Sequence, residues 1–151
     1  MTELLGFYTG TWDNFLDMFM KGNIIYGNYM EHVMEYYNAS KTNDNILIVA
    51  YEDVKKHPEK QIRRLAKFLG TQLSDAEMEE ILGYTTFEVM SKNPNTNHEG
   101  SPFFDFTRSK FMRKGIVGDW KNHFTVAQSE MFDVWIEEHI KQSDIKFCYE
   151  L

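Results

Sequence analysis

Positive charge is concentrated between residues 108 and 121 of an otherwise acidic chain. The only acid in this stretch is Asp119, and its cations are Arg108, Lys110, Arg113, Lys114 and Lys121. Arginine can bind phosphate oxygens through two parallel hydrogen bonds, and lysine adds a point charge. Gly115 follows the central pair, and because glycine has no Cβ its backbone N–H can approach a ligand closely. The pattern indicates a site for the phosphate group of a small ligand, and an ordinary exposed basic loop is the alternative that charge alone leaves open.

The composition limits the partners that such a site can serve. The chain has 151 residues, of which 42% are hydrophobic and 15% aromatic, and this is enough for one domain with a packed core. Its formal net charge of −7 argues against binding to nucleic acid or to an anionic membrane. The single cysteine, Cys148, fits a reducing compartment. Since the sequence after Met1 also lacks the pattern of a signal peptide or a transmembrane helix, we expect a cytoplasmic protein.

The hydrophobic pattern predicts several helices and one strand. Residues 46–50 are continuously apolar and mostly β-branched, which is typical of a strand buried on both faces of a parallel sheet. We therefore expect a strand over residues 45–51, with Tyr51 at the end that borders the ligand crevice in such sheets. Its partner strands would have to lie outside this sequence, because one strand is not a sheet. A mostly loop segment is expected at 85–111, and helices are expected at 10–22, 27–40, 57–70, 74–83 and 125–142.

Three of these helices carry residue types that cap helix N-termini. Thr11 precedes the first helix, and Ser74 is followed three residues later by Glu77. Thr125 and Gln128 repeat that spacing before the last helix. A hydroxyl followed by Glu or Gln at this distance is typical of a capping box, in which each side chain binds the backbone N–H of the other residue.

The stretch FMRKGIVGDWKNHFT, residues 111–125, resembles the C-terminal signature of cytosolic sulfotransferases. These enzymes take their sulfuryl group from 3′-phosphoadenosine 5′-phosphosulfate (PAPS). The segments GTWDNFLDMFMKG, YEDVKKHP and TTFEVMSKNPNTN, together with the C-terminal helix, resemble the same family in the same order. The resemblance implies that residues 1–151 are the C-terminal portion of a single sulfotransferase domain. The fold class it implies is α/β, with part of a P-loop-like parallel sheet flanked by helices and the clear strand at 45–51.

The resemblance also assigns a nucleotide site. Arg113, Lys114 and Gly115 would hold the 3′-phosphate of PAPS, and Tyr51 would approach the adenine. The remaining wall would be formed by Thr85, Thr86, Phe87, Met90, Phe111 and Met112. Without the family match, the apolar members of this set are equally well interpreted as core residues, and Tyr51 as a tyrosine at the end of a strand.

The segment NTNHEGSPFFDFTRSK, residues 95–110, would be the family's loop over acceptor and nucleotide. Three aromatic residues in a polar loop are hard to bury locally, which favours a role against a ligand. Phe103, Phe104 and Phe106 are the candidates for contact with the acceptor. We expect that acceptor to be a small molecule such as a phenol, an alcohol or a steroid.

A second motif matches the family's dimer signature, K-x-x-x-T-V-x-x-x-E. Its residues here are Lys121, Thr125, Val126 and Glu130. In a homodimer, two copies related by a two-fold axis could pair Lys121 of each with Glu130 of the other. Such a patch would be small and weak by itself. The alternative is an ordinary entry into a helix, in which Thr125 acts only as a cap.

The groups that would perform the transfer are not found in this sequence. In the family, a Gly-rich phosphate loop with a catalytic Lys binds the 5′-phosphosulfate, and a His acts as the general base. We expect surface or capping roles for all five histidines, His32, His57, His98, His123 and His139, and no metal, because no metal-ligand spacing is present. The chain is thus interpreted as half of a PAPS-dependent sulfotransferase, inactive alone. The alternative is a catalytically inactive truncated relative that serves as a nucleotide-binding or dimerisation module.

Overall fold

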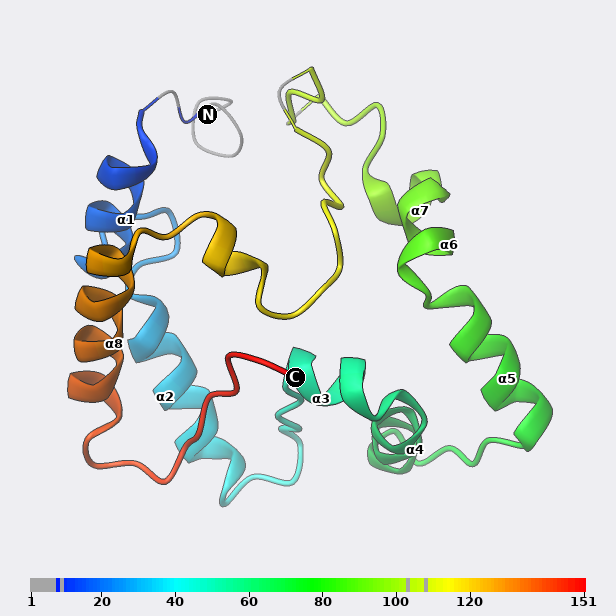
Figure 1. Ribbon diagram of the computed structural model, residues 1–151. Helices are drawn as coiled ribbons and strands as arrows, with labels where there is room; N and C mark the ends of the chain where they lie inside the picture. Colours follow the sequence, from blue (N-terminus) through cyan, green and yellow to red (C-terminus); the bar gives the residue numbers. More distant parts are fainter. Residues whose placement is uncertain (1–7, 9, 103, 108) are drawn as a thin grey trace. The chain divides into compact units, whose positions relative to one another are not determined.

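The computed structural model describes residues 8, 10–102, 104–107 and 109–151 (Figure 1). These residues fall into two compact units. The α3–α7 unit includes Val49–Ile116, and the α1–α2–α8 unit comprises Gly10–Ile48 and Val117–Leu151. The elements are α1 (Trp12–Met20), α2 (Tyr29–Ser40), α3 (Tyr51–Lys56), α4 (Pro58–Phe68), α5 (Asp75–Tyr84), α6 (Phe87–Lys92), α7 (Pro94–Asn97), the 3-10 helix η2 (Asp119–Asn122) and α8 (Val126–Ile140).

In the α1–α2–α8 unit, α2 lies beside α8 (Figure 1), and Phe19 and Met20 of α1 pack against the core that these two helices form. Met30 of α2 is buried against Trp135 and Ile136 of α8. The indole of Trp135 stacks on Phe132 at 5.1 Å between ring centroids and donates a hydrogen bond of 3.0 Å to the carbonyl of Met20. This bond satisfies a carbonyl in the last turn of α1, which has no partner within its own helix.

The start of α8 is fixed by the expected capping box. The backbone N–H of Gln128 donates to the Thr125 hydroxyl at 3.3 Å, and the N–H of Thr125 donates to the Gln128 side chain at 2.9 Å. The same Gln128 amide donates to the carboxylate of Asp13 and accepts a hydrogen bond from the indole of Trp12 on α1. One side chain therefore closes the cap and joins α8 to α1.

The α3–α7 unit is a succession of short helices in which each packs mainly on its neighbour in the chain. Pro58 is the first residue of α4, where its missing N–H costs no helical hydrogen bond. Ala66 of α4 and Met78 of α5 are its buried apolar residues. The helices expected at 57–70 and 74–83 are thus confirmed as α4 and α5, as are those at 10–22, 27–40 and 125–142 as α1, α2 and α8.

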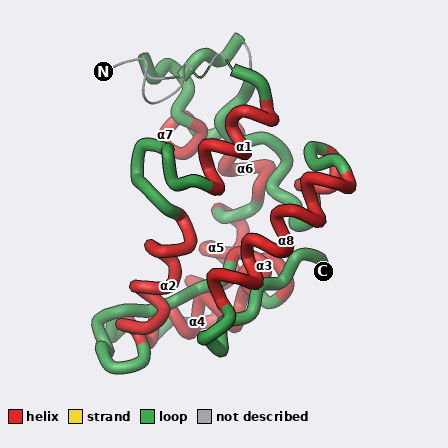
Figure 2. The backbone as a smooth tube through the Cα atoms, turned by 90° about the vertical axis from the view of Figure 1, so that its left-hand side faces the viewer, coloured by secondary structure: helices red, strands yellow, loops and turns green. Residues whose placement is uncertain are grey.

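The expected strand at 45–51 is wrong. Figure 2 shows helices and loops but no strand among the described residues. Ala50 is extended, with φ −78° and ψ 135°, whereas Tyr51 already begins α3. Ile48 and Val49 are 37% and 38% exposed, so the segment is not buried on both faces. A β-strand requires a neighbouring strand to pair with, and the described residues contain no strand.

The segment 85–111 is mostly loop, as expected, but it also contains the short helices α6 and α7. The hydroxyl of Thr86 accepts from the N–H of Val89 and begins α6. The side chain of Asn93 accepts from the N–H of Asn95, and Pro94 occupies the first position of α7. Both helices are short, so local caps rather than hydrophobic periodicity mark them.

No helix in the described ranges has the length and apolarity needed to cross a lipid bilayer.

Candidate functional site

Gly115 packs directly against the ring of Phe87. Its backbone has φ +62°, a conformation that residues with a side chain rarely adopt. A Cβ at this position would lie 2.2 Å from Cδ2 of Phe87, well inside van der Waals contact. Only glycine therefore fits between this loop and α6. The structure brings together two residues that the sequence assigned to the nucleotide site from positions 28 residues apart.

The two threonines before Phe87 join α5 to α6. Thr85 follows the last residue of α5 and its hydroxyl donates to the carbonyl of Ile81 at 2.8 Å. Thr86 caps α6 and its hydroxyl donates to the carbonyl of Gly83 at 3.2 Å. Both side chains have structural partners here, and together they hold Phe87 in the position where Gly115 meets it.

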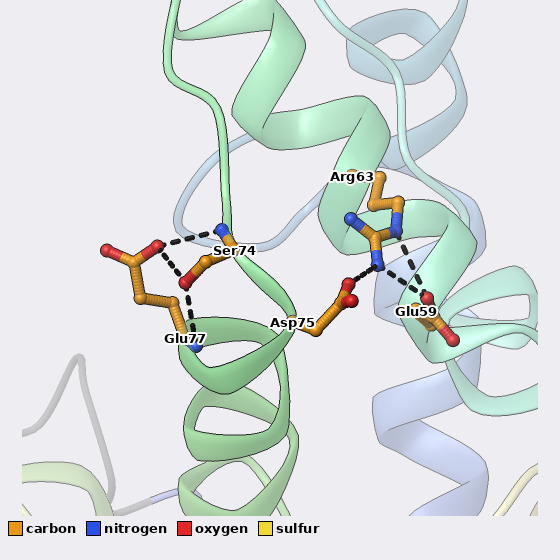
Figure 3. A network of polar contacts seen from close by, with 5 residues as sticks. All are labelled: Glu59, Arg63, Ser74, Asp75 and Glu77. Carbon is orange, nitrogen blue, oxygen red and sulfur yellow. Dashed lines mark hydrogen bonds and ion pairs between the residues drawn. The ribbon is translucent and has the colours of Figure 1, made fainter.

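The position of α5 is itself fixed by two polar contacts at its start (Figure 3). Arg63 of α4 donates to Glu59 at 2.8 Å and to Asp75, the first residue of α5, at 3.2 Å. Beside it, the hydroxyl and N–H of Ser74 donate to Glu77, and these two bonds lower the pKa of the Glu77 carboxyl. The capping box expected at Ser74 and Glu77 is confirmed. The Arg63 contacts and the capping box together position α5, the helix that Thr85 follows.

Phe111 and Met112 line a pocket of about 210 Å³ on the α3–α7 unit. Its other lining residues are Ser91, Asn97, Glu99, Phe106 and Lys110. Asn97 shapes this pocket, because its amide donates to the carbonyl of Ser91 and its oxygen accepts from the N–H of Glu99. Sequence reasoning missed these polar residues, although an Asn that binds backbone two residues ahead is a recognisable turn signal.

Phe104 belongs to a small aromatic cluster with His98, Phe106 and Phe111. Phe104 lies 5.1 Å from Phe111 and 5.7 Å from His98, and the His98 ring meets Phe111 edge-on at 4.5 Å. These aromatic rings therefore find partners within their own loop region. His98 has φ +57°, the only non-glycine residue with positive φ in the described part of the chain. Phe103 and Arg108 lie outside the described residues.

The remaining residues of the expected nucleotide site are distributed over the Arg113 loop, α6 and the start of α3. The side chains of Arg113 and Lys114 are exposed beside Gly115. Met90 is half-buried on α6. Tyr51 is 49% exposed at the start of α3, and no hydrogen bond or ring contact within the described ranges joins it to the Arg113 loop. All of these residues nevertheless belong to the same unit, α3–α7.

The residues of the expected dimer motif all belong to the other unit, α1–α2–α8. Lys121 lies in η2 and forms an ion pair with Glu150 of its own chain. Thr125 caps α8, as described above. Val126 is 76% exposed, and Glu130 is exposed one turn further along the helix. The motif thus presents an apolar and an acidic side chain at the surface, while its lysine has an intramolecular partner.

The histidines occupy capping and packing positions. His57 and His98 end α3 and α7 respectively. His139 interacts with the carbonyl of Trp135 at 2.7 Å, and His123 pairs with the buried Asp119 at 3.3 Å. Within the described ranges, no three His, Cys, Asp or Glu side chains are grouped so that they could hold a metal ion.

Comparison with known proteins shows that the sequence matches sulfotransferases. A family model described as "Sulfotransferase domain" matches residues 6–144. Sulfotransferase 1B1 of Canis lupus familiaris is 40% identical over 144 residues, and cytosolic sulfotransferase 1 of Danio rerio is 42% identical over 142 residues. Each alignment covers 94% of this chain and 48% of the relative. The chain therefore spans about half the length of these curated relatives.

Solved structures of retinol dehydratase and of a mouse sulfotransferase also align with this chain. Retinol dehydratase, in complex with androsterone and the inactive cofactor PAP, aligns with a TM-score of 0.84 and 28% identity, covering 93% of this chain and 41% of that one. Mouse sulfotransferase SULT7A1, complexed with PAP, aligns with a TM-score of 0.76 and 35% identity, covering 90% and 49%. The chain thus shares its fold with part of these proteins. The secondary structure of this chain, within the described residues, consists of helices.

Proposed function

The chain belongs to the sulfotransferase domain family, and from that premise we propose that it supplies half of a PAPS-dependent sulfuryl-transfer site. Arg113, Lys114 and Gly115 bind the 3′-phosphate of the nucleotide. The nucleotide wall is completed by Tyr51, Thr85, Thr86, Phe87, Met90, Phe111 and Met112. The observation that carries the proposal is the close contact of Gly115 with Phe87, which joins the charged loop to the wall.

The charge and backbone of the loop support the binding of an anion. Two exposed cations stand beside a glycine whose conformation excludes a side chain. An arginine fork and a lysine ammonium match the oxygens of a phosphate monoester. Three of the aligned structures hold PAP, which carries the same 3′-phosphate group. The donor nucleotide supplies the sulfuryl group, and these residues bind and orient it.

The pocket and the aromatic cluster next to this loop support an acceptor role for the segment around Phe104. Phe111 faces both the pocket and the cluster. One aligned structure of retinol dehydratase contains androsterone and another contains retinol, and both molecules are small and largely apolar. The acceptor of this chain is accordingly a small molecule with a hydroxyl or amine to be sulfated. Phe103 and Phe104 are its proposed contacts.

The chain by itself binds nucleotide without transferring sulfate. Its sequence has no Gly-rich phosphate loop with a lysine, and its histidines serve caps and packing. A radiolabelled-sulfate assay with phenol and sterol acceptors tests this part of the proposal. Turnover by the isolated chain would overturn it.

A second candidate function is a non-catalytic module that binds nucleotide or a second copy of the chain. It is favoured by the exposure of Val126 and Glu130 in the dimer motif, which belongs to a different unit from the nucleotide residues. In such a homodimer, Lys121 of one copy pairs with Glu130 of the other. In both candidate functions the protein is cytoplasmic, like its relative named cytosolic sulfotransferase 1.

Nucleotide binding is tested by calorimetry with PAP and with adenosine 5′-monophosphate, which lacks the 3′-phosphate. We expect Arg113→Ala and Lys114→Ala each to weaken PAP binding about tenfold to a hundredfold, because each removes a charge-assisted hydrogen bond. Lys60→Ala, which removes an exposed cation on α4 of the same unit, is the control and leaves binding unchanged. Equal affinity of all variants for PAP, or equal affinity of the wild type for the two nucleotides, would refute the 3′-phosphate site.

A further inference from the structure

The C-terminal segment Phe147–Glu150 is anchored on the same surface as the dimer motif. The indole N–H of Trp120 donates to the carbonyl of Tyr149 at 3.2 Å. The next residue, Lys121, forms its ion pair with Glu150, and its ammonium also lies 5.8 Å from the centre of the Trp120 ring. Two consecutive residues of η2 therefore hold two consecutive residues of the C-terminal segment.

The segment also follows α8. The ring of Phe147 packs against the core cluster of Trp135 and Ile136. Burial, followed by the nearby carboxylates of Asp133 and Glu137, raises the pKa of the Tyr149 phenol. Asp133 and Glu137 both belong to α8.

Asp133 and Glu137 share a face of α8 with the dimer motif. Positions 126, 130, 133 and 137 recur at the three- and four-residue spacing that places side chains above one another on one helix face. The C-terminal segment packs on α8 through Phe147, beside Trp135 and Ile136. Val126 and Glu130, in the first turns of α8, stay exposed.

Lys121 consequently has two alternative carboxylate partners. Within one chain its partner is Glu150, and in the proposed two-copy contact its partner is Glu130 of the other copy. The Lys121–Glu150 pair is solvent-exposed, with 50% and 64% of the two side chains accessible. An exposed pair of this kind is weak and readily exchanged.

We propose that the segment Phe147–Glu150 competes with a second copy of this chain for Lys121 and so limits self-association. This inference rests on the proposed two-copy contact between Lys121 and Glu130. The competitor is part of the same chain, so it acts at every protein concentration. A second copy displaces it only when the protein is concentrated or when the segment is held elsewhere.

The test is sedimentation equilibrium of the full chain at fixed ionic strength. Glu150→Gln removes the competing charge and should tighten dimerisation about 2- to 30-fold, since a symmetric dimer exchanges two such exposed pairs. Glu35→Gln, on the surface of α2, makes the same change in net charge and serves as the matched control. Equal dimer dissociation constants for Glu150→Gln and Glu35→Gln would overturn the competition.

Two further measurements separate this inference from the contact on which it rests. Adding Glu130→Gln to Glu150→Gln should cancel the gain in association, and a gain that persists would show that the partner of Lys121 is not Glu130. Amide hydrogen exchange at residues 147–150 should accelerate in Glu150→Gln, because the segment is released. Faster exchange without tighter association would refute the competition. Unchanged PAP affinity in these variants would show that the nucleotide site is independent of it.

Discussion

Gly115 and Phe87 fit together so closely that a single methyl group between them would collide with the aromatic ring. The Cβ of an alanine at position 115 would stand 2.2 Å from Cδ2, 2.8 Å from Cγ and 3.0 Å from Cε2 of Phe87. The ring is carried by the first turn of α6, and α6 is held to α5 by the two threonines. The conformation of the Arg113 loop is thus set by packing as well as by charge.

Gly115→Ala should destabilise the α3–α7 unit and weaken PAP binding. Alanine at φ +62° costs about 1–2 kcal/mol of backbone energy, and the collision with Phe87 adds about 1–3 kcal/mol. Gly100→Ala is the control, because Gly100 has φ +81° but no neighbour within 4 Å of its Cβ position. Urea unfolding of both variants measures the difference.

The contribution of the collision can be isolated in a double-mutant cycle. In a Phe87→Ala background, Gly115→Ala should cost no more than Gly100→Ala does, since the ring is gone. An undiminished cost in that background would show that the packing against Phe87 is not what requires glycine.

Ser74→Ala should destabilise the start of α5 by about 0.5–2 kcal/mol, because it removes the oxygen that caps the helix. Ser74→Asn, which keeps a capping oxygen, should restore most of this loss. Thermal unfolding followed by circular dichroism measures both variants. If alanine and asparagine are equally stable, the cap seen in Figure 3 does not contribute to stability.

The same cap predicts a dependence of stability on pH. Hydrogen bonds from the Ser74 hydroxyl and then from its N–H hold the pKa of Glu77 below its ordinary value of 4.5. A carboxyl whose pKa is lowered by folding stabilises the folded state above its unfolded pKa, and this contribution disappears as the pH falls through the folded pKa. Glu77→Gln should therefore reduce the loss of unfolding free energy below pH 4.5, whereas Glu79→Gln, on the same helix, should not. An identical pH profile for the two variants would contradict the assignment.

Trp135→Phe should destabilise the α1–α2–α8 unit by about 1–3 kcal/mol. The change leaves the Met20 carbonyl without its donor and removes part of a buried ring. Trp12→Phe also removes an indole donor between α1 and α8, but Trp12 is 39% exposed as a residue, so water can replace the bond and the cost should stay below about 1 kcal/mol. Urea unfolding that ranks the two variants in the opposite order would contradict the proposed role of Trp135.

Local structure was largely predictable from the sequence, because its causes lie within a few residues. Thr11, Ser74 and Thr125 cap the helices that follow them, as their types and spacing indicated. The short helices α6 and α7 were missed because a hydrophobic stripe needs several turns to be visible. Their signals were Thr86 and Asn93, two cap residues whose partners lie two or three positions ahead.

The strand was wrongly predicted because composition alone does not make a strand. Strand formation depends on pairing with a second extended segment, and no described residue is part of a strand. The expectation that the loop aromatics are hard to bury locally was also wrong in part, since Phe104 contacts His98 and Phe111 within the same unit. Both strand pairing and the burial of Phe104 depend on contacts with residues outside the local segment.

The sequence by itself determined the family, the helix starts and the charged loop, because motifs and caps are encoded by residues close together in the chain. Only the tertiary structure decided that Gly115 meets Phe87 and that Lys121 pairs with Glu150. Both contacts join residues about 30 positions apart, and no rule of local spacing connects them. They form because the packing of helices brings the segments together, which is the physical reason that the details of the site required a structure.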